Sequence, residues 1–188
     1  MSPVRPRHAA SLILLRQTRQ GPQVLMGRRP ARSRFAPDVF VFPGGAVDAA
    51  DRLARPLSPL SEDCARRTAA GPRLAQALAI AALRETAEET GLALAPDLAA
   101  LTLLARAITP PSSPVRFHAR FFVADAGLAA GEPSESAELS DLAFRPLDEA
   151  LALPVFDVTE IILRALADGG GAFRLTYRRG VPIVTPLP

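Results

Sequence analysis

The sequence contains no lysine and no tryptophan, a single cysteine and only two histidines. All 22 basic residues are therefore arginine, and with 19 acidic residues they give a formal net charge of +3. A long nucleic-acid partner would require a stronger excess of positive charge, so the balance favours a small anionic ligand. The calculated pI of about 10.3 overstates how basic the protein is at neutral pH, because arginine stays protonated far above pH 7.

The scarcity of cysteine and the absence of long hydrophobic runs exclude several classes of protein. Cys64 has no second cysteine with which to form an internal disulfide, and a cysteine-based zinc site is not indicated. We interpret it as an inert, half-buried thiol. The apolar run at 11–15 is too short to span a membrane and no signal cleavage site follows it. We therefore expect a reduced, cytoplasmic protein with no membrane partner.

Length and apolar content predict a single globular domain, residues 1–188, because 48% of the residues are hydrophobic. Apolar runs predict strands at 9–16, 24–28, 39–42, 101–108, 115–124, 142–145 and 172–177. Segments without internal glycine or proline predict helices at 73–90, 147–153 and 158–167. This irregular alternation predicts an α/β (α+β) fold in which a mixed β-sheet packs between helices.

The segment 52–72 interrupts this pattern. It carries three prolines and shows no strong periodicity. We expect an inserted surface loop there, with one short helix near 61–70, next to whatever site its two ends belong to.

A cluster of carboxylates ends the longest predicted helix. Glu85, Glu88 and Glu89 are spaced i, i+3 and i+4, so on a helix they share one face. They repel one another, and they lie in the last turn, where the helix dipole disfavours negative charge. A divalent cation such as Mg²⁺ would relieve both conflicts, since it prefers carboxylate oxygens. A solvated acidic helix end, paired with Arg84, is the alternative.

The surrounding residues resemble the signature of the Nudix hydrolase family, Gly-x5-Glu-x7-Arg-Glu-U-x-Glu-Glu-x-Gly-U, where U is a bulky apolar residue. Residues 84–92 match its second half, with Thr86 at the first apolar position, and the segment 42–45, Phe-Pro-Gly-Gly, resembles its opening. The standard spacing from Gly45 would place the arginine at position 59; it stands at 84, 25 residues later. An insertion of this kind resembles the acyl-coenzyme A diphosphatase branch.

The signature's early glutamate has no counterpart in this chain. Its position falls on Asp51 when counted from Gly45, and on Gln76 when counted back from Arg84. Asp51 and Asp48 are the candidates to supply the missing carboxylate oxygen.

The resemblance implies a Nudix-like mixed sheet sandwiched between helices and a pyrophosphohydrolase dependent on Mg²⁺ or Mn²⁺. Glu85, Glu88 and Glu89 would be metal ligands together with the Gly45 carbonyl, and Arg84 would orient the glutamates. The general base would come either from Glu85 or Glu88 in the signature, or from a later loop that contains Glu135 and Glu138.

The substrate implied is a small nucleotide-type molecule. Arg29 and Arg34 match the arginines of the coenzyme A branch, whereas its glycine, threonine and serine positions do not match. Gly44 would lie beside the substrate. Coenzyme A or an acyl-coenzyme A is one interpretation; ADP-ribose, a nucleoside-diphosphate sugar, or an inactive Nudix-like binding module are the alternatives. The sequence leaves a homodimer open.

Overall fold

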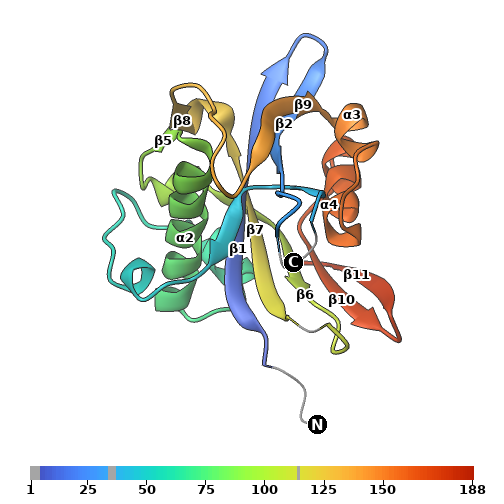
Figure 1. Ribbon diagram of the computed structural model, residues 1–188. Coiled ribbons are helices and arrows are strands. Elements are labelled where there is room, and N and C mark those ends of the chain that lie inside the picture. Colours follow the sequence, from blue (N-terminus) through green and yellow to red (C-terminus); the bar gives the residue numbers. More distant parts are fainter. Residues whose placement is uncertain (1–4, 34–36, 114) are drawn as a thin grey trace.

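The computed structural model describes residues 5–33, 37–113 and 115–188, and over these ranges it contains one large mixed sheet with helices on both faces (Figure 1). The strands of this sheet are β1 (Arg7–Thr18), β2 (Gly21–Arg28), β3 (Phe40–Val41), β4 (Gly44–Ala46), β6 (Thr102–Ile108), β7 (Phe117–Asp125), β9 (Ser140–Pro146), β10 (Phe173–Arg178) and β11 (Val181–Pro186). Their order is β11-β10-β6-β7-β1-β2-β3, with β4 also paired to β1 and β9 to β2. Two short strands, β5 (Ala93–Leu94) and β8 (Ala129–Ala130), form a separate pair.

Four helices and three 3-10 turns complete the described part of the chain. They are α1 (Glu62–Arg67), α2 (Pro72–Thr90), α3 (Leu147–Leu151), α4 (Asp157–Ala167), η1 (Ala50–Arg52), η2 (Leu98–Ala100) and η3 (Ala126–Leu128). In Figure 1, α2 lies on one side of the sheet and α3 and α4 lie on the other. The predicted mixed sheet between helices is confirmed.

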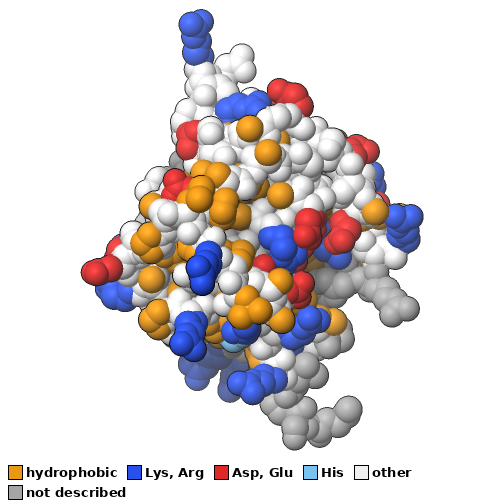
Figure 2. Space-filling model, turned by 90° about the vertical axis from the view of Figure 1, so that its left-hand side faces the viewer, with side chains coloured by type: hydrophobic (Ala, Val, Ile, Leu, Met, Phe, Trp, Pro, Cys, Tyr) orange, Lys and Arg blue, Asp and Glu red, His pale blue; other side chains and the backbone are white. Residues whose placement is uncertain are grey.

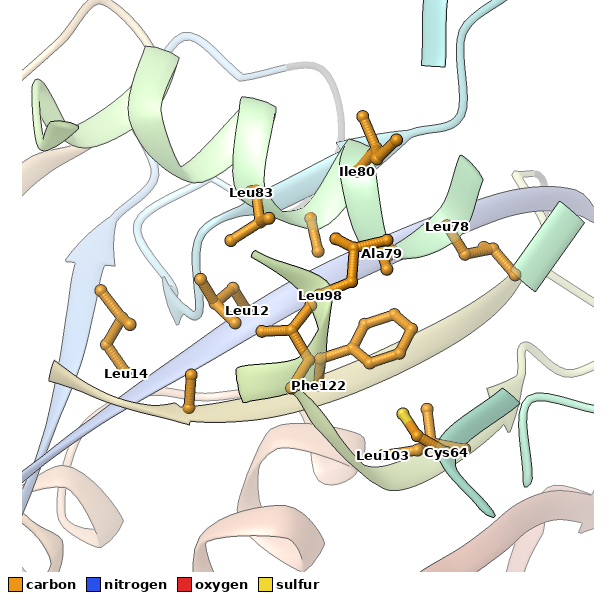
Figure 3. Packing of buried hydrophobic residues seen from close by; sticks show 14 of the residues in the cluster. Leu12, Leu14, Cys64, Leu78, Ala79, Ile80, Leu83, Leu98, Leu103 and Phe122 are labelled. Carbon is orange, nitrogen blue, oxygen red and sulfur yellow. The ribbon is translucent and has the colours of Figure 1, made fainter. Parts of the chain in front are cut away.

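The apolar side chains of β1 point alternately into two hydrophobic cores, one on each face of the sheet. Leu12 and Leu14 face α2 and pack with Phe122 and Leu83 (Figure 3), whereas Ile13 faces the opposite way and packs with Ile162 of α4. Side chains of a strand point alternately to its two faces, so a run of apolar residues serves both layers. The central strands are thus covered on both faces and hold the loops at their ends in fixed positions.

Helix α2 carries the acidic cluster and is defined at both ends by its sequence. Pro72 occupies the first turn, where its missing N–H costs nothing. Gly91 ends the helix in the left-handed conformation, with φ of 70°, and its N–H donates to the Ala87 carbonyl. The predicted helix at 73–90 is confirmed.

The segment 52–72 is only partly a surface loop. Leu53 and Leu57 are exposed, but α1 is docked: Cys64 is 2% exposed, and Thr68 is fully buried. The expectation of an excursion outside the core is wrong for α1, and so is the interpretation of Cys64 as half-buried. The Cys64 side chain of α1 packs in the same core as Leu103 and Phe122 (Figure 3).

Three sets of strands were not expected from the sequence: β4, the β5–β8 pair and β11. β4 consists of Gly-Gly-Ala, and all six residues of β11 are exposed, so neither shows an apolar alternation. No helix of the described residues is both long enough and apolar enough to cross a membrane.

Candidate active site

The C-terminal end of α2 and the short strand β4 meet at the carboxylate cluster. Ser11 and Ala10 of β1 pair with Gly44 and Gly45, which fixes β4 beside the sheet. The Gly44 N–H donates to Oε2 of Glu89 over 2.8 Å, and Glu89 is only 7% exposed. The sheet therefore orients the most buried glutamate through one backbone hydrogen bond.

Gly45 leaves room for the second glutamate. A Cβ atom at this position would lie 2.4 Å from Cδ of Glu85 and 2.5 Å from both of its carboxylate oxygens. Any other residue would therefore displace the Glu85 carboxylate. The close approach explains in physical terms why a glycine is placed opposite this helix.

Arg84 organises the remaining carboxylates. Its Nε and Nη2 donate to the two oxygens of Asp51 at 2.9 and 3.1 Å, which is a bidentate fork, and Asp51 is 1% exposed. Nη1 donates to Glu88 at 3.0 Å, and Nη2 lies 2.9 Å from Oε1 of Glu85. The hydrogen bonds to Asp51 are the main reason that the pKa of Arg84 is raised. The buried Asp51 carboxylate therefore fixes the orientation of the Arg84 guanidinium.

The glutamates carry an electrostatic conflict. Burial raises the pKa of the Glu89 carboxyl to about 8, and the negative charges of Glu85 and Glu138 add to the effect, while the Gly44 N–H and Arg29 oppose it. Burial also raises the pKa of Glu85, against the opposing effect of Arg84. Glu85 and Glu89 are thus desolvated and lie near the negative charge of Glu138, an arrangement that a bound cation would stabilise.

Glu138 and Arg29 belong to two loops that line an open pocket of about 280 Å³, and the charges of both residues act on Glu89. The loop after β2 contributes Arg29 and Arg32, and the loop between β8 and β9 contributes Ala137 and Glu138. Nη2 of Arg32 donates to the Ala137 carbonyl over 3.3 Å, so the two loops are tied together. Nε of Arg29 is buried and has no hydrogen-bond acceptor among the described residues.

Not every predicted residue is part of this arrangement. The Glu135 carboxylate accepts a hydrogen bond from the Asp141 N–H, and Glu135 does not line the pocket that contains Glu138. Glu88 is directed to Arg84, and its side chain is 60% exposed. Arg34 lies outside the described residues. Among the described residues, no three carboxylate, histidine or cysteine side chains already converge at metal-ligand spacing. Glu85 and Glu88 each form an ion pair with Arg84, at 2.9 and 3.0 Å.

Two contributions were less visible in the sequence. Asp51 was one of two candidates for the missing carboxylate; the other, Asp48, has a 66% exposed side chain 3.9 Å from Arg84. Counting from Gly45 points to Asp51, and its burial beside Arg84 makes it an anchor of the arginine. Arg32 carried no signal apart from its place in an arginine-rich loop.

Comparisons with known proteins identify relatives of this chain. The family model of the NUDIX domain matches residues 5–166. A NUDIX hydrolase from Alicyclobacillus acidocaldarius is similar in structure, with 30% identity, coverage of 88% of this chain and 92% of that chain, and a TM-score of 0.72.

More distant structures share the fold. A MutT mutator protein from Bacillus halodurans has 18% identity, coverage of 97% and 99%, and a TM-score of 0.61. The NUDIX domain of Shewanella oneidensis NrtR, solved with ADP-ribose, has 18% identity, coverage of 88% and 89%, and a TM-score of 0.58. No curated protein matches the sequence. The family model spans most of the chain, and this protein belongs to the Nudix family of hydrolases.

Proposed function

We propose that this Nudix hydrolase cleaves the pyrophosphate bond of a nucleoside diphosphate linked to a second group, using Mg²⁺ or Mn²⁺ held by Glu85, Glu88 and Glu89. The observation that carries the proposal is the buried Glu89. Its carboxylate is fixed by the Gly44 N–H, lies near Glu85, and has a pKa of about 8 because it is desolvated among like charges. A divalent cation would stabilise its charged form.

The residues fit such a cation in kind and in place. The proposed donors are carboxylate oxygens, which Mg²⁺ and Mn²⁺ prefer. Glu85 lies against Gly45, and Glu89 follows it by one helical turn. Glu85 and Glu88 would turn from Arg84 toward the ion, and Arg84 would keep its fork to Asp51. A bound cation would neutralise phosphate oxygens and lower the pKa of the attacking water.

The chain's own residues supply positioning and proton transfer. Arg84, anchored by Asp51, sets the positions of Glu85 and Glu88 through hydrogen bonds. Glu138 is the proposed general base: it lines the pocket beside Arg29, and its carboxylate forms no ion pair within the described part of the chain. We assign Arg29, which lines the pocket, and Gly44, which follows the same loop, to substrate binding. The intact glutamate set argues against an inactive binding module.

Metal binding and turnover test this assignment. Glu89→Gln should remove most divalent-ion binding and lower kcat by at least about 100-fold, while the thermal unfolding midpoint stays near that of the wild type. Mn²⁺ binding followed by isothermal calorimetry gives a readout independent of the substrate. Glu149→Gln, on an exposed position of α3, is the matched control. Wild-type turnover in Glu89→Gln would contradict the metal site.

For the substrate, we propose coenzyme A or an acyl-coenzyme A, because Arg29 lines the pocket and Arg34 follows in the same loop of the sequence. The arginines would bind the 3′-phosphate. Losing a charge-assisted hydrogen bond costs about 1.5–3 kcal/mol, so coenzyme A should exceed 3′-dephospho-coenzyme A by roughly 10- to 100-fold in kcat/KM. Arg29→Ala or Arg34→Ala should shrink this ratio.

A panel that also contains ADP-ribose, a nucleoside-diphosphate sugar and dinucleotide polyphosphates separates the substrate from the reaction class. Turnover of ADP-ribose without turnover of coenzyme A would reject the coenzyme A branch and leave the metal-dependent hydrolase intact. We also propose that residues 1–188 form one domain and that 52–72 is an insertion within the signature.

A further inference from the structure

A row of arginines crosses the face of the sheet that α1 and α2 cover. Arg120 of β7 is the direct partner of Arg106 on β6, and Arg106 is the partner of Arg174 on β10. One rung along the sheet, His8 of β1 is paired with His118 of β7. Directly paired residues project from the same face, so these side chains form a continuous row across β10, β6, β7 and β1, each next to the one on the adjacent strand.

Arg120 is the buried centre of this group, with 1% exposure. Its Nε and Nη2 donate to the Thr68 carbonyl at the end of α1, at 3.1 and 3.0 Å, and Nη1 donates to the His118 carbonyl at 2.8 Å. Nη1 also lies 3.4 Å from Nδ1 of His8. A guanidinium can only donate, so Nδ1 accepts and the neutral ring carries its proton on Nε2. His8 therefore keeps one N–H donor to offer.

Within the described residues, no negative charge pairs with this group of side chains. The charged neighbours that act on His8 are Arg120, Arg52 and Arg5, and those that act on Arg120 and Arg106 are likewise arginines. No carboxylate of the described residues forms an ion pair with Arg106 or Arg174, and the buried Nε of Arg106 has no acceptor among them. Burial, with these like charges, lowers the pKa of Arg120 to about 10.

The group also reaches the surface. His8, His118 and Arg106 are half-buried, and Arg174 is exposed. Figure 2 shows a histidine side chain at the lower part of the α2 face with several arginine side chains around it. An anion from solution would therefore meet N–H donors and positively charged arginines. The Nε of Arg106 would gain the hydrogen-bond acceptor that it lacks.

We propose that His8, His118, Arg106 and Arg174 form a binding site for a small oxyanion of the phosphate class, distinct from the carboxylate site. Guanidinium groups match the geometry of phosphate oxygens, and the N–H of His8 adds a neutral donor. The two sites flank the same residue of β1: Ala10 pairs with Gly45 on one side and with Arg120 on the other. They differ in sign, because one is built from carboxylates and the other from arginines.

The composition of the chain makes this site unusually easy to observe. His8 and His118 are its only histidines, so the imidazole NMR signals report on this location alone. Inorganic phosphate is titrated into the 188-residue chain in a buffer that contains EDTA, with KCl keeping the ionic strength constant. The expected result is a saturable shift of both histidine signals. Arg106→Gln should weaken phosphate binding by about tenfold, as expected for the loss of one charge-assisted hydrogen bond.

Two control variants separate this site from the hydrolytic pocket and from general surface charge. Arg29→Gln alters the pocket beside the glutamates, and Arg164→Gln removes an exposed arginine of α4; both should bind phosphate as the wild type does. Arg174→Gln is the second test variant should Arg106→Gln unfold. AMP in place of inorganic phosphate shows whether the site takes a phosphate monoester more tightly than the free ion.

The proposal is overturned by histidine signals that do not shift or that shift linearly to about 50 mM phosphate, a concentration at which a site of millimolar affinity is saturated. Unchanged affinity in Arg106→Gln and Arg174→Gln would overturn it as well. Loss of the shift in Arg29→Gln would place the phosphate in the hydrolytic pocket instead.

Discussion

At the scale of single residues, the pair of aspartates near Arg84 illustrates how position decides role. Asp51 is buried and forms a fork with Arg84, whereas Asp48 is largely exposed and lies 3.9 Å from the same guanidinium. Counting along the family signature pointed to Asp51 but did not decide between them. Burial distinguishes them, because Asp51 is 1% exposed and held by Arg84, whereas the Asp48 side chain is 66% exposed.

Asparagine substitutions should separate the two aspartates. Asp51→Asn is expected to lower the free energy of unfolding by about 2–3 kcal/mol, less than for a fully buried pair because Arg84 keeps partial solvent access. Asp48→Asn should change it by no more than about 0.5 kcal/mol. Urea denaturation of both variants measures the difference. Equal effects would mean that the fork contributes nothing beyond surface charge.

His118 gives stability a pH dependence. Burial first, and then the positive charges near it, lower the pKa of His118 to about 4. The unfolded chain, with an ordinary histidine pKa of about 6.5, therefore binds more protons between about pH 4 and 6.5, and the free energy of unfolding falls as the pH falls through this window.

We expect His118 to contribute roughly 1–2 kcal/mol to this loss, after allowance for solvent screening. Urea denaturation at pH 7 and pH 5 should show a smaller loss for His118→Gln than for the wild type. The difference between the two proteins isolates the histidine from the carboxylates that titrate lower. Identical losses would show that His118 titrates as it does in water.

At the scale of elements, much was predictable and the failures have physical causes. The helix at 73–90 was predictable because its alanine-rich interior, first-turn proline and terminal glycine all agree. The glutamates were found because they break local rules. β4 was not, because Gly-Gly-Ala has no pattern and its pairing depends on β1 lying beside it. The docking of α1 depends on the carbonyl of Thr68 meeting Arg120, a contact that spans 52 residues of sequence.

The docking of α1 can be followed through its cysteine. Burial raises the pKa of the Cys64 thiol and shields it from solvent. A thiol reagent should therefore label the native protein at least about 100-fold more slowly than the unfolded chain, because reaction requires α1 to open. Labelling kinetics in native buffer and in urea test this. Rapid native labelling would mean that α1 is detached, as expected of a surface insertion.

At the scale of the whole molecule, the outermost strand of the described sheet, β11, leaves one backbone edge unpaired. β11 pairs with β10 through a two-residue turn in which Arg179 and Gly180 have φ values of 53° and 80°. In such a hairpin the closing pair is hydrogen-bonded and the next is not, so alternate residues of β11 turn their backbone outward. These residues are Pro182, Val184 and Pro186.

Two of these three outward positions therefore have no N–H to donate. Val181, Ile183 and Val184 are exposed, and an apolar strand with a free edge would otherwise recruit a strand of another molecule. Because these prolines cannot donate a hydrogen bond to an added strand, we expect them to prevent strand addition at this edge. Replacing both Pro182 and Pro186 by threonine should cause concentration-dependent association in light scattering, whereas replacing Pro22 by threonine should not. A monodisperse double variant would mean that solubility rests on charge alone.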